Sequence, residues 1–274
     1  MKYKSENQMK HDLNHLNNYY IYYVIGFFLI VILIFMLIDT DDKEIEYFGR
    51  IRFLDKQETT HFFKSDKDDY IKKLTPFDIK AQKSKSKKDY QNKIIESADS
   101  FTPEERLRIE KACKRADDAL ERINIPGFDG IKASNLDWNL ALTRGRKYED
   151  GLPHTRLDTI FLSELVLLSS DDQIAKTMLH EKVHVYERLF PEDIEIWMRS
   201  QGYKPYKKWS DFKIARSNPD INEWSYLDPN GKPMVVLYKT HNLNSIHDVK
   251  YSGEQDPSNE HPYETLAYTL EQYL

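Results

Sequence analysis

The sequence contains a single cysteine, Cys113, among 274 residues. No disulfide can therefore form within the chain, which excludes a disulfide-stabilised scaffold and a zinc site built from several cysteines. A basic excess is also absent, because 45 aspartates and glutamates outnumber 40 lysines and arginines and the net charge is −5. Proteins that bind nucleic acid concentrate basic residues on one face, so we expect no nucleic-acid partner.

Charge is missing altogether from residues 19–38, which read YYIYYVIGFFLIVILIFMLI. Twenty helical residues span roughly 30 Å, the thickness of the hydrocarbon core of a bilayer. The alternatives are a buried core helix and a cleaved signal peptide. Apolar residues on every face argue against the first, and the length of the run and the lack of a small-residue cleavage site argue against the second. The sequence therefore predicts one transmembrane helix in contact with membrane lipid.

The flanks of this run predict an orientation and a domain organisation. Lysines precede the run and acidic residues follow it, so the positive-inside rule places the short tail 1–18 in the cytoplasm and the C-terminal part across the membrane. A cellular and a viral membrane are both compatible with this arrangement. Residues 39–100 are polar, with a lysine-rich stretch at 80–93, and are expected to form a solvated linker or stalk. Organised structure is expected over residues 101–274, and the sequence leaves the oligomeric state open.

Helix and strand patterns alternate over residues 101–274. Thr102, Pro103 and Glu105 form a helix start with a capping box, which predicts a helix over 102–124. The other expected elements are strands at 136–143 and 157–163, a helix at 171–190, a hairpin of 223–227 with 234–239, and a last helix from Pro262. These elements predict an α+β fold in which a small sheet, a central helix and a C-terminal helix form one domain, preceded by the transmembrane helix.

The helix at 171–190 contains the segment His180-Glu181-Lys182-Val183-His184. Four-residue spacing puts both imidazoles on one face of the helix, where both reach a single Zn²⁺ at about 2.0–2.1 Å. Glu181 projects near the same face and is suited to take a proton from a zinc-bound water. Apolar residues fall on the opposite side. We therefore expect His180 and His184 to bind zinc and Glu181 to be catalytic, with an accidental occurrence of the pattern as the alternative.

This segment resembles the HExxH motif of the zincin metallopeptidases. The resemblance implies a zinc-dependent peptidase in which the two histidines are ligands and Glu181 is the general base. It also implies that the upstream strand at 157–163 forms the cleft edge that holds an extended peptide. The resemblance covers about residues 101–274. A weaker likeness links the chain to uncharacterised proteins of large DNA viruses described as metallopeptidases.

Two histidines leave a catalytic zinc one protein ligand short. The His-x-x-Gly-x-x-His continuation of the metzincins is absent after His184, whereas in the gluzincins the third ligand lies on a later helix. Glu264 follows Pro262 in the first turn of the last helix and resembles the Pro-x-Glu-x-x-Ala arrangement of gluzincin-like families. Glu264 is therefore the expected third ligand and His261 the next candidate, although a carboxylate at a helix start is also favoured by the helix dipole. The remaining candidates are Glu223, Glu254, Glu260, His241 and His247.

A hydrolase of this kind also needs a group that stabilises the oxyanion. The candidates are Tyr226, Tyr238, His241 and Tyr263. Together the motif and the apolar run predict a membrane-anchored zinc metallopeptidase with a peptide or protein substrate. Two alternatives stay open. One is a membrane or virion structural protein that keeps a zincin fold without activity, and the other is a zinc hydrolase that acts on a non-peptide amide.

Overall fold

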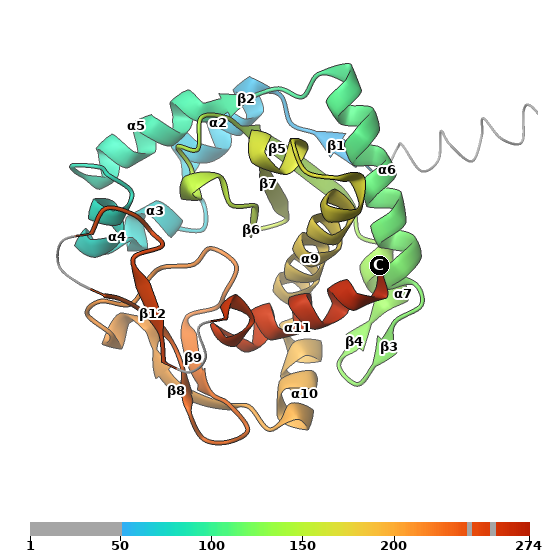
Figure 1. The fold of residues 1–274 in the computed structure, drawn as a ribbon, viewed down its shortest axis with the longest axis vertical. Helices are drawn as coiled ribbons and strands as arrows, with labels where there is room; N and C mark the ends of the chain where they lie inside the picture. The colour runs from blue at the N-terminus through green and yellow to red at the C-terminus, as the bar shows by residue number, and fades with distance from the viewer. Residues whose placement is uncertain (1–50, 240–242, 253–255) are drawn as a thin grey trace, which may run out of the picture. The chain divides into compact units, whose positions relative to one another are not determined.

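The computed structural model describes residues 51–239, 243–252 and 256–274, which are arranged around a five-stranded sheet. The strands are β1 (Ile51–Phe53), β2 (Ala98–Asp99), β5 (Trp138–Thr143), β6 (His154–Arg156) and β7 (Thr159–Ser163). Their order is β1-β5-β7-β6, with β2 paired to the end of β5. β1 and β7 run parallel to β5, whereas β6 runs antiparallel to β7 at the edge of the sheet. The sheet is thus mixed, and β6 lies at one of its edges (Figure 1).

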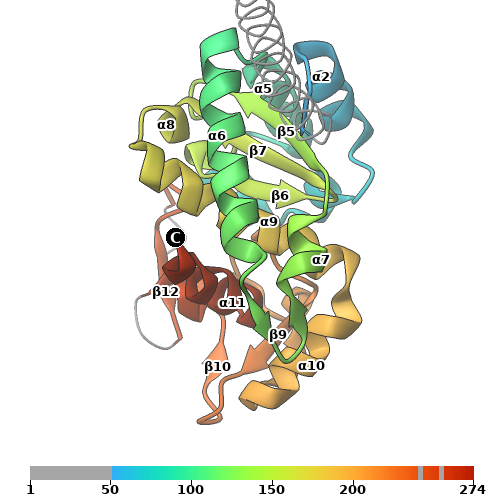
Figure 2. The same ribbon diagram turned by 90° about the vertical axis from the view of Figure 1, so that its right-hand side faces the viewer.

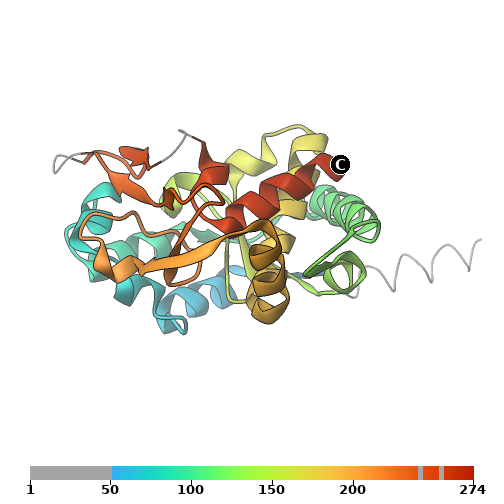
Figure 3. The same ribbon diagram turned by 90° about the horizontal axis from the view of Figure 1, so that it is seen from below.

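Helices cover both faces of this sheet. Side chains alternate along a strand, so Ala141 and Phe161 point to one face while Leu140 and Ile160 point to the other, and all four are buried. The first face packs on α2 (Lys56–Ser65) and α5 (Lys87–Ser97). On the other face lie α6 (Pro103–Leu120) and α9 (Asp171–Leu189), which contact each other along their lengths. Figures 2 and 3 show these two layers of helices on either side of the strands.

The prediction of a linker at 39–100 is wrong for residues 51–99, because β1, α2, α5 and β2 lie in this segment. Two further short helices, α3 (Tyr70–Lys73) and α4 (Pro76–Ala81), lie between α2 and α5. The few apolar side chains of this segment, including Phe63, Tyr90 and Ile94, join one buried cluster with the sheet. The lysines of 80–93 lie mostly on the solvent side of these helices. The average hydrophobicity of this segment is low, but nearly every apolar side chain in it is buried or partly buried. The low average therefore did not indicate that the segment folds.

The predicted helix starts are confirmed. Thr102 caps α6 in a capping box with Glu105, and Ser170 caps α9. Between these helices the chain forms a small hairpin and two short helices. They are β3 (Asn124–Ile125), β4 (Phe128–Asp129), α7 (Gly130–Ser134) and α8 (Glu164–Leu167).

After α9 the chain forms α10 (Pro191–Gln201) and two smaller sheets before it returns to the site. The strands are β8 (Lys204–Lys208), β9 (Trp224–Leu227), β10 (Pro233–Met234), β11 (Val236–Tyr238) and β12 (Val249–Tyr251). The predicted hairpin is present where β9 pairs with β10, but β11 pairs with β12 instead. The last helix, α11 (Pro262–Leu270), packs against α9 (Figures 1 and 3). This contact brings the C-terminal helix to the histidines.

Residues 19–38, where the sequence predicts a transmembrane helix, lie outside the described residues. Within 51–239, 243–252 and 256–274, no helix has both the length and the apolar character that crossing a bilayer requires. The two longest, α6 with 18 residues and α9 with 19, each contain several charged side chains. The predicted fold class and the predicted single-pass membrane localisation therefore stand corrected. Over the described residues the structure is a mixed α/β fold.

Candidate metal centre

Three of the predicted site residues converge at one point between α9 and α11. The Nε2 atoms of His180 and His184 lie 3.1 Å apart. The Oε2 atom of Glu264 lies 3.5 Å from Nε2 of His180 and 3.9 Å from Nε2 of His184. Ligand atoms about 2.0–2.1 Å from a tetrahedral zinc lie about 3.3 Å from each other. The three atoms therefore have the spacing of a site that could hold one metal ion.

Hydrogen bonds orient both imidazoles toward this point. Nδ1 of His180 donates to Oε1 of Glu271 at 2.8 Å, and Nδ1 of His184 donates to Oε2 of Glu187 at 2.7 Å. Because a carboxylate accepts, each Nδ1 carries a proton, which leaves Nε2 as the ring atom directed at the common point. Histidines that bind metals are held by carboxylates in this way. The donor set of two imidazole nitrogens and a carboxylate oxygen suits Zn²⁺.

The third ligand candidate is held by its helix and by one amide. Pro262 begins α11 and His261 caps it, so Glu264 lies in the first turn, at the end of the helix that faces α9. Nδ2 of Asn218 donates to Oε1 of Glu264 at 2.9 Å, which leaves Oε2 facing the histidines. The carboxylate is thus presented in one orientation.

The pKa values of the two histidines shift in opposite directions, and that of Glu264 is lowered. Burial works to lower the pKa of His180, but hydrogen bonds to Glu264 and Glu271 raise it well above its usual value. Burial lowers the pKa of His184 well below its usual value. Although burial opposes it, the hydrogen bond with His180 and the charge of His184 hold the pKa of Glu264 at about 2. In the metal-free protein a proton on His180 therefore occupies the place that a cation would take.

Glu181 lies beside this group in a separate environment. It is 2% exposed, and Oγ1 of Thr155 on β6 donates to its Oε2 at 2.9 Å. Burial raises the pKa of Glu181 to about 7, although the charge of His180 and the bond from Thr155 oppose that shift. A carboxyl group with a pKa near neutrality exchanges protons readily at physiological pH.

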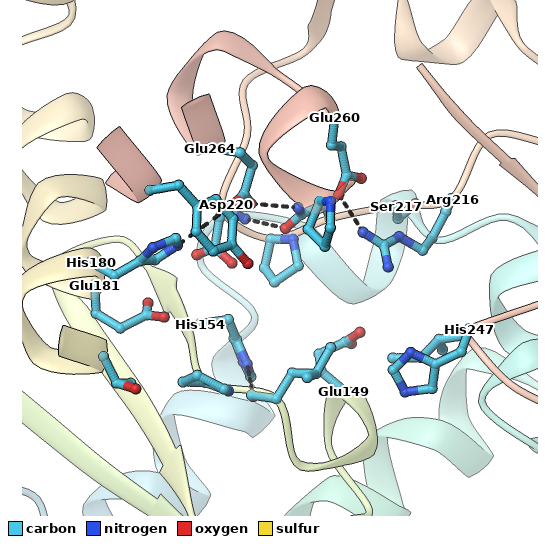
Figure 4. A pocket seen from close by; sticks show the side chains of 18 of the residues that line it. Glu149, His154, His180, Glu181, Arg216, Ser217, Asp220, His247, Glu260 and Glu264 are labelled. Atoms are coloured by element: carbon cyan, nitrogen blue, oxygen red, sulfur yellow. Dashed lines mark hydrogen bonds and ion pairs between the residues drawn. The ribbon is translucent and has the colours of Figure 1, made fainter. Parts of the chain in front are cut away.

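A cavity of about 400 Å³ opens beside these residues. His180, Glu181 and Glu264 line one side of it, and Glu149, Arg216 and His247 lie further along its wall (Figure 4). The ring of Tyr268 lines the same cavity and packs edge-on against His180, with centroids 4.6 Å apart. The candidate metal centre is therefore accessible to a small segment of another molecule.

Other candidates from the sequence have different partners. Nε2 of His261 lies 3.1 Å from the carbonyl oxygen of Trp224, so this side chain is occupied at the base of α11. Glu260 forms an ion pair with Arg216, and Nε2 of His247 lies 3.1 Å from Oδ2 of Asp150. Glu223 is not part of the convergent group, and His241 and Glu254 lie outside the described residues.

The tyrosines proposed as oxyanion donors are also engaged elsewhere. The hydroxyl of Tyr238 donates to Asp78 at 2.9 Å. The hydroxyls of Tyr226 and Tyr263 both accept from the amide of Asn222, at 3.0 and 3.2 Å. None of the three lines the cavity.

The prediction of the strand that forms the edge of the cleft is wrong. The strand expected there, at 157–163, forms β7, which lies inside the sheet between β5 and β6. The edge strand is β6, which a two-residue turn at 157–158 joins to β7, with Leu157 at a φ of 55°. The backbone groups of Thr155 on this strand already have partners outside the sheet. Its N–H donates to Oδ1 of Asp220, at 2.6 Å, and its carbonyl oxygen accepts from Arg188, at 3.0 Å. At Thr155 the edge is therefore not free to pair with an extended peptide.

Several supporting residues were missed from the sequence. Glu187 is three residues beyond His184 on the same helix face, so its spacing was a usable signal for a group that orients the ring. Thr155, Asn218 and Glu271 come from distant parts of the chain and carried no local signal. The segment 218–220 supplies two side chains that contact site residues.

Comparison with known proteins identifies no family for this chain. No family model matches it, and no solved structure matches it significantly. The chain is similar to a UDP-N-acetylmuramoylalanine–D-glutamate ligase of Chlamydia pneumoniae, with 28% identity over 93 residues. That match covers 28% of this chain and 22% of the ligase, so the chain spans about a fifth of the length of the curated relative.

Proposed function

We propose that this protein is a zinc-dependent metallopeptidase. The observation that carries the proposal is the convergence of His180, His184 and Glu264 on one point, with Glu181 beside them on the same helix. These are the residue types and the spacing that a catalytic zinc site uses, three protein ligands and a neighbouring carboxylate. The choice of peptides as substrates rests on the resemblance of the helix to the zincin motif.

The side chains divide the work of hydrolysis between them. A zinc ion held by His180, His184 and Glu264 would supply Lewis acidity and lower the pKa of water. Glu181 takes a proton from the attacking water and returns it to the leaving amine, for which a pKa of about 7 is well matched. Thr155 holds the Glu181 carboxylate in place through its hydroxyl. Glu187 and Glu271 fix the tautomers of the histidines.

The number of carboxyl groups around the point of convergence supports a divalent cation. Four carboxylates, those of Glu181, Glu187, Glu264 and Asp220, are buried in this region, where isolated charges are strongly disfavoured. Burial, together with the charges of Glu181 and Glu264, raises the pKa of Asp220 well above its usual value. A divalent ion would offset this repulsion.

The ligase similarity does not favour a second function. It covers a small part of both chains. The two alternatives that remain to be tested are an inactive protein with the same fold and a zinc hydrolase acting on a non-peptide amide.

Metal analysis and peptide cleavage test the proposal together. Protein purified without chelator should hold one zinc per chain and should cleave members of a quenched peptide library. His180→Ala should lose the zinc. Glu181→Gln should keep the zinc and its thermal stability but lose about 10²–10⁴-fold in kcat, because only the proton transfer is removed.

The outcomes separate the alternatives. Absence of zinc in the wild-type protein would refute the metal site. Stoichiometric zinc without activity on any amide would indicate the inactive protein, and turnover of non-peptide amides alone would indicate the other hydrolase.

A further inference from the structure

Six acidic side chains line the cavity beside the candidate metal centre. They are Glu149, Glu181, Asp220, Glu260, Glu264 and Glu271. Among the described residues that line it, Arg216 is the only lysine or arginine, and it pairs with Glu260. The whole chain is nearly balanced in charge, with 45 acids and 40 bases. Negative charge is therefore concentrated at this cavity.

Glu149 differs from the other carboxylates in what holds it. It is 5% exposed, and its Oε1 accepts from the hydroxyls of Tyr70 and Tyr90 at 3.0 and 2.6 Å. Its Oε2 accepts from the amide of Gln82 at 2.9 Å. All three donors are neutral, and within the described part of the chain no basic side chain forms an ion pair with Glu149. Buried carboxylates are normally paired with a cation, whereas Glu149 has only neutral hydrogen-bond donors, with the charge of Arg216 acting on it through space.

The backbone holds Glu149 at the cavity wall in a strained conformation. Glu149 and Asp150 have φ angles of 43° and 53°, and Gly151 follows at 83°. Consecutive non-glycine residues rarely adopt the left-handed region, and such strain persists where the surrounding structure enforces it. In Figure 4 the Glu149 side chain lies across the cavity from Glu264.

His154 contributes a second acceptor to the same cavity. It is 2% exposed, and its Nδ1 donates to the carbonyl oxygen of Leu152 at 3.0 Å. Its Nε2 therefore has a free lone pair, and that atom is buried without a hydrogen-bond partner. Stacking on Phe161 and an edge contact with Tyr148 fix the ring. A buried polar atom without a partner, on the wall of a cavity, indicates a place for a ligand that donates hydrogen bonds.

Burial raises the pKa of Glu149 even though Tyr90 and Tyr70 donate to it. A bound cation would offset that unfavourable burial. Ammonium and guanidinium groups combine positive charge with several N–H donors, so they match a carboxylate that has only neutral donors and an empty imidazole acceptor.

We propose that Glu149 and His154 form a subsite for a positively charged group of the substrate, which is a peptide that presents an ammonium or guanidinium next to the bond to be cleaved. Its peptide nature rests on the proposed function. The charged group has two possible sources, the amino terminus and a lysine or arginine side chain.

Matched peptides test this subsite. One pair of substrates differs only by lysine or norleucine beside the cleaved bond, and each is made with a free and an acetylated amino terminus. The wild-type protein should prefer the charged peptide by about tenfold or more in kcat/KM. If acetylation of the amino terminus slows cleavage, the amino terminus is the charged group that the subsite binds. If replacing lysine by norleucine slows cleavage, the lysine side chain is that group.

Glu149→Gln should remove the preference by slowing only the charged peptides, while the neutral peptides are cleaved as before. Glu96→Gln, which removes one exposed carboxylate on α5, should leave the preference unchanged. His154→Phe keeps the aromatic packing and should reduce the preference severalfold, which provides a second test if Glu149→Gln does not fold. An equal rate for charged and neutral peptides in the wild-type protein would overturn the subsite.

A measurement of peptide binding tests the subsite independently of the proposed peptidase activity. If no peptide is cleaved, calorimetry with the Glu181→Gln protein should still show tighter binding of the charged peptide, and Glu149→Gln in that background should abolish the difference. Equal binding of both peptides would refute the subsite, whatever the outcome of the cleavage assay.

Discussion

Both faces of α9 bury ionisable side chains, but these side chains have different kinds of partner on the two faces. Lys182 lies halfway between His180 and His184 in the sequence and so projects from the opposite side of the helix. It is fully buried, its Nζ lies 3.4 Å from Oδ1 of Asp117, and it stands 3.8 Å above the Trp138 ring. It also donates to the carbonyl oxygen of Leu136. On this face a buried charge has all its partners within the protein.

On the other face the polar groups converge without completing each other. The Nε2 atoms of both histidines and the Glu264 carboxylate face a common point, and several acidic side chains lie around them. The comparison teaches that burial of charge alone does not indicate function. A face whose charges are matched internally stabilises the fold, whereas a face whose ligand atoms remain open is suited to bind something else.

Lys182→Met should have the largest effect, and on stability alone. Removing the ammonium leaves Asp117 buried without its cation, which should lower the free energy of unfolding by about 3–5 kcal/mol. Urea unfolding measures the change, and zinc content should remain one per chain. Lys182→Met with Asp117→Asn should recover most of the loss. A large loss of zinc in the folded single variant would contradict the separation of the two faces.

Glu264→Gln should have the next largest effect, and on metal affinity. It replaces a charged ligand by a neutral one at nearly constant volume, so zinc affinity should fall by about 100-fold or more, beyond the usual effect of groups that only orient ligands. Competition with a chromophoric chelator measures the affinity. Glu260→Gln is the matched control, because Glu260 lines the same cavity but pairs with Arg216. Equal losses in both variants would argue against Glu264 as a ligand.

Glu187→Gln and Glu271→Gln should each weaken zinc binding by about tenfold, because the amide still accepts from Nδ1 but no longer supports the imidazole with a negative charge. The same chelator competition gives the value. Unchanged affinity in both variants would show that these carboxylates do not tune the histidines.

Thr155→Val should have the smallest effect. It removes the hydroxyl that donates to Glu181 while keeping the shape of the side chain, so kcat should fall severalfold, equivalent to about 0.5–1.5 kcal/mol. Zinc content should not change. Thr143→Val, in a buried position on β5, is the control, because its hydroxyl donates only to the carbonyl oxygen of Leu162. A similar decrease in both variants would indicate a general effect on the sheet.

Much of the helical part of the fold and the centre of the site were predictable from the sequence. Thr102, Pro103 and Glu105 act within one turn, so the start of α6 is a local property. The spacing of His180 and His184 places both rings on one side of α9 for the same reason. Glu264 was identified by its position in the first turn after Pro262, and the structure places it with the two histidines.

The edge of the sheet was not predictable in the same way. Strand β6 is three residues long and contains His154, Thr155 and Arg156, which form no apolar alternation. Its identity as a strand depends on pairing with β7 across a two-residue turn. The predicted edge strand was consequently the apolar β7, which the tertiary structure covers on both sides.

By itself, the sequence determined the features that act within a few residues: the caps of α6 and α9, the helical spacing of the two histidines and Glu181, and the lack of disulfides. Tertiary structure alone decided the features that join distant segments. The buried Arg156 guanidinium is bound by Asp66 and Asp68, about 90 residues earlier and within the segment expected to be a linker. Glu149 is likewise held by side chains 59 to 79 residues away. Such partners produce no periodic pattern in the sequence, because a buried charge requires only that its counterpart be near in space.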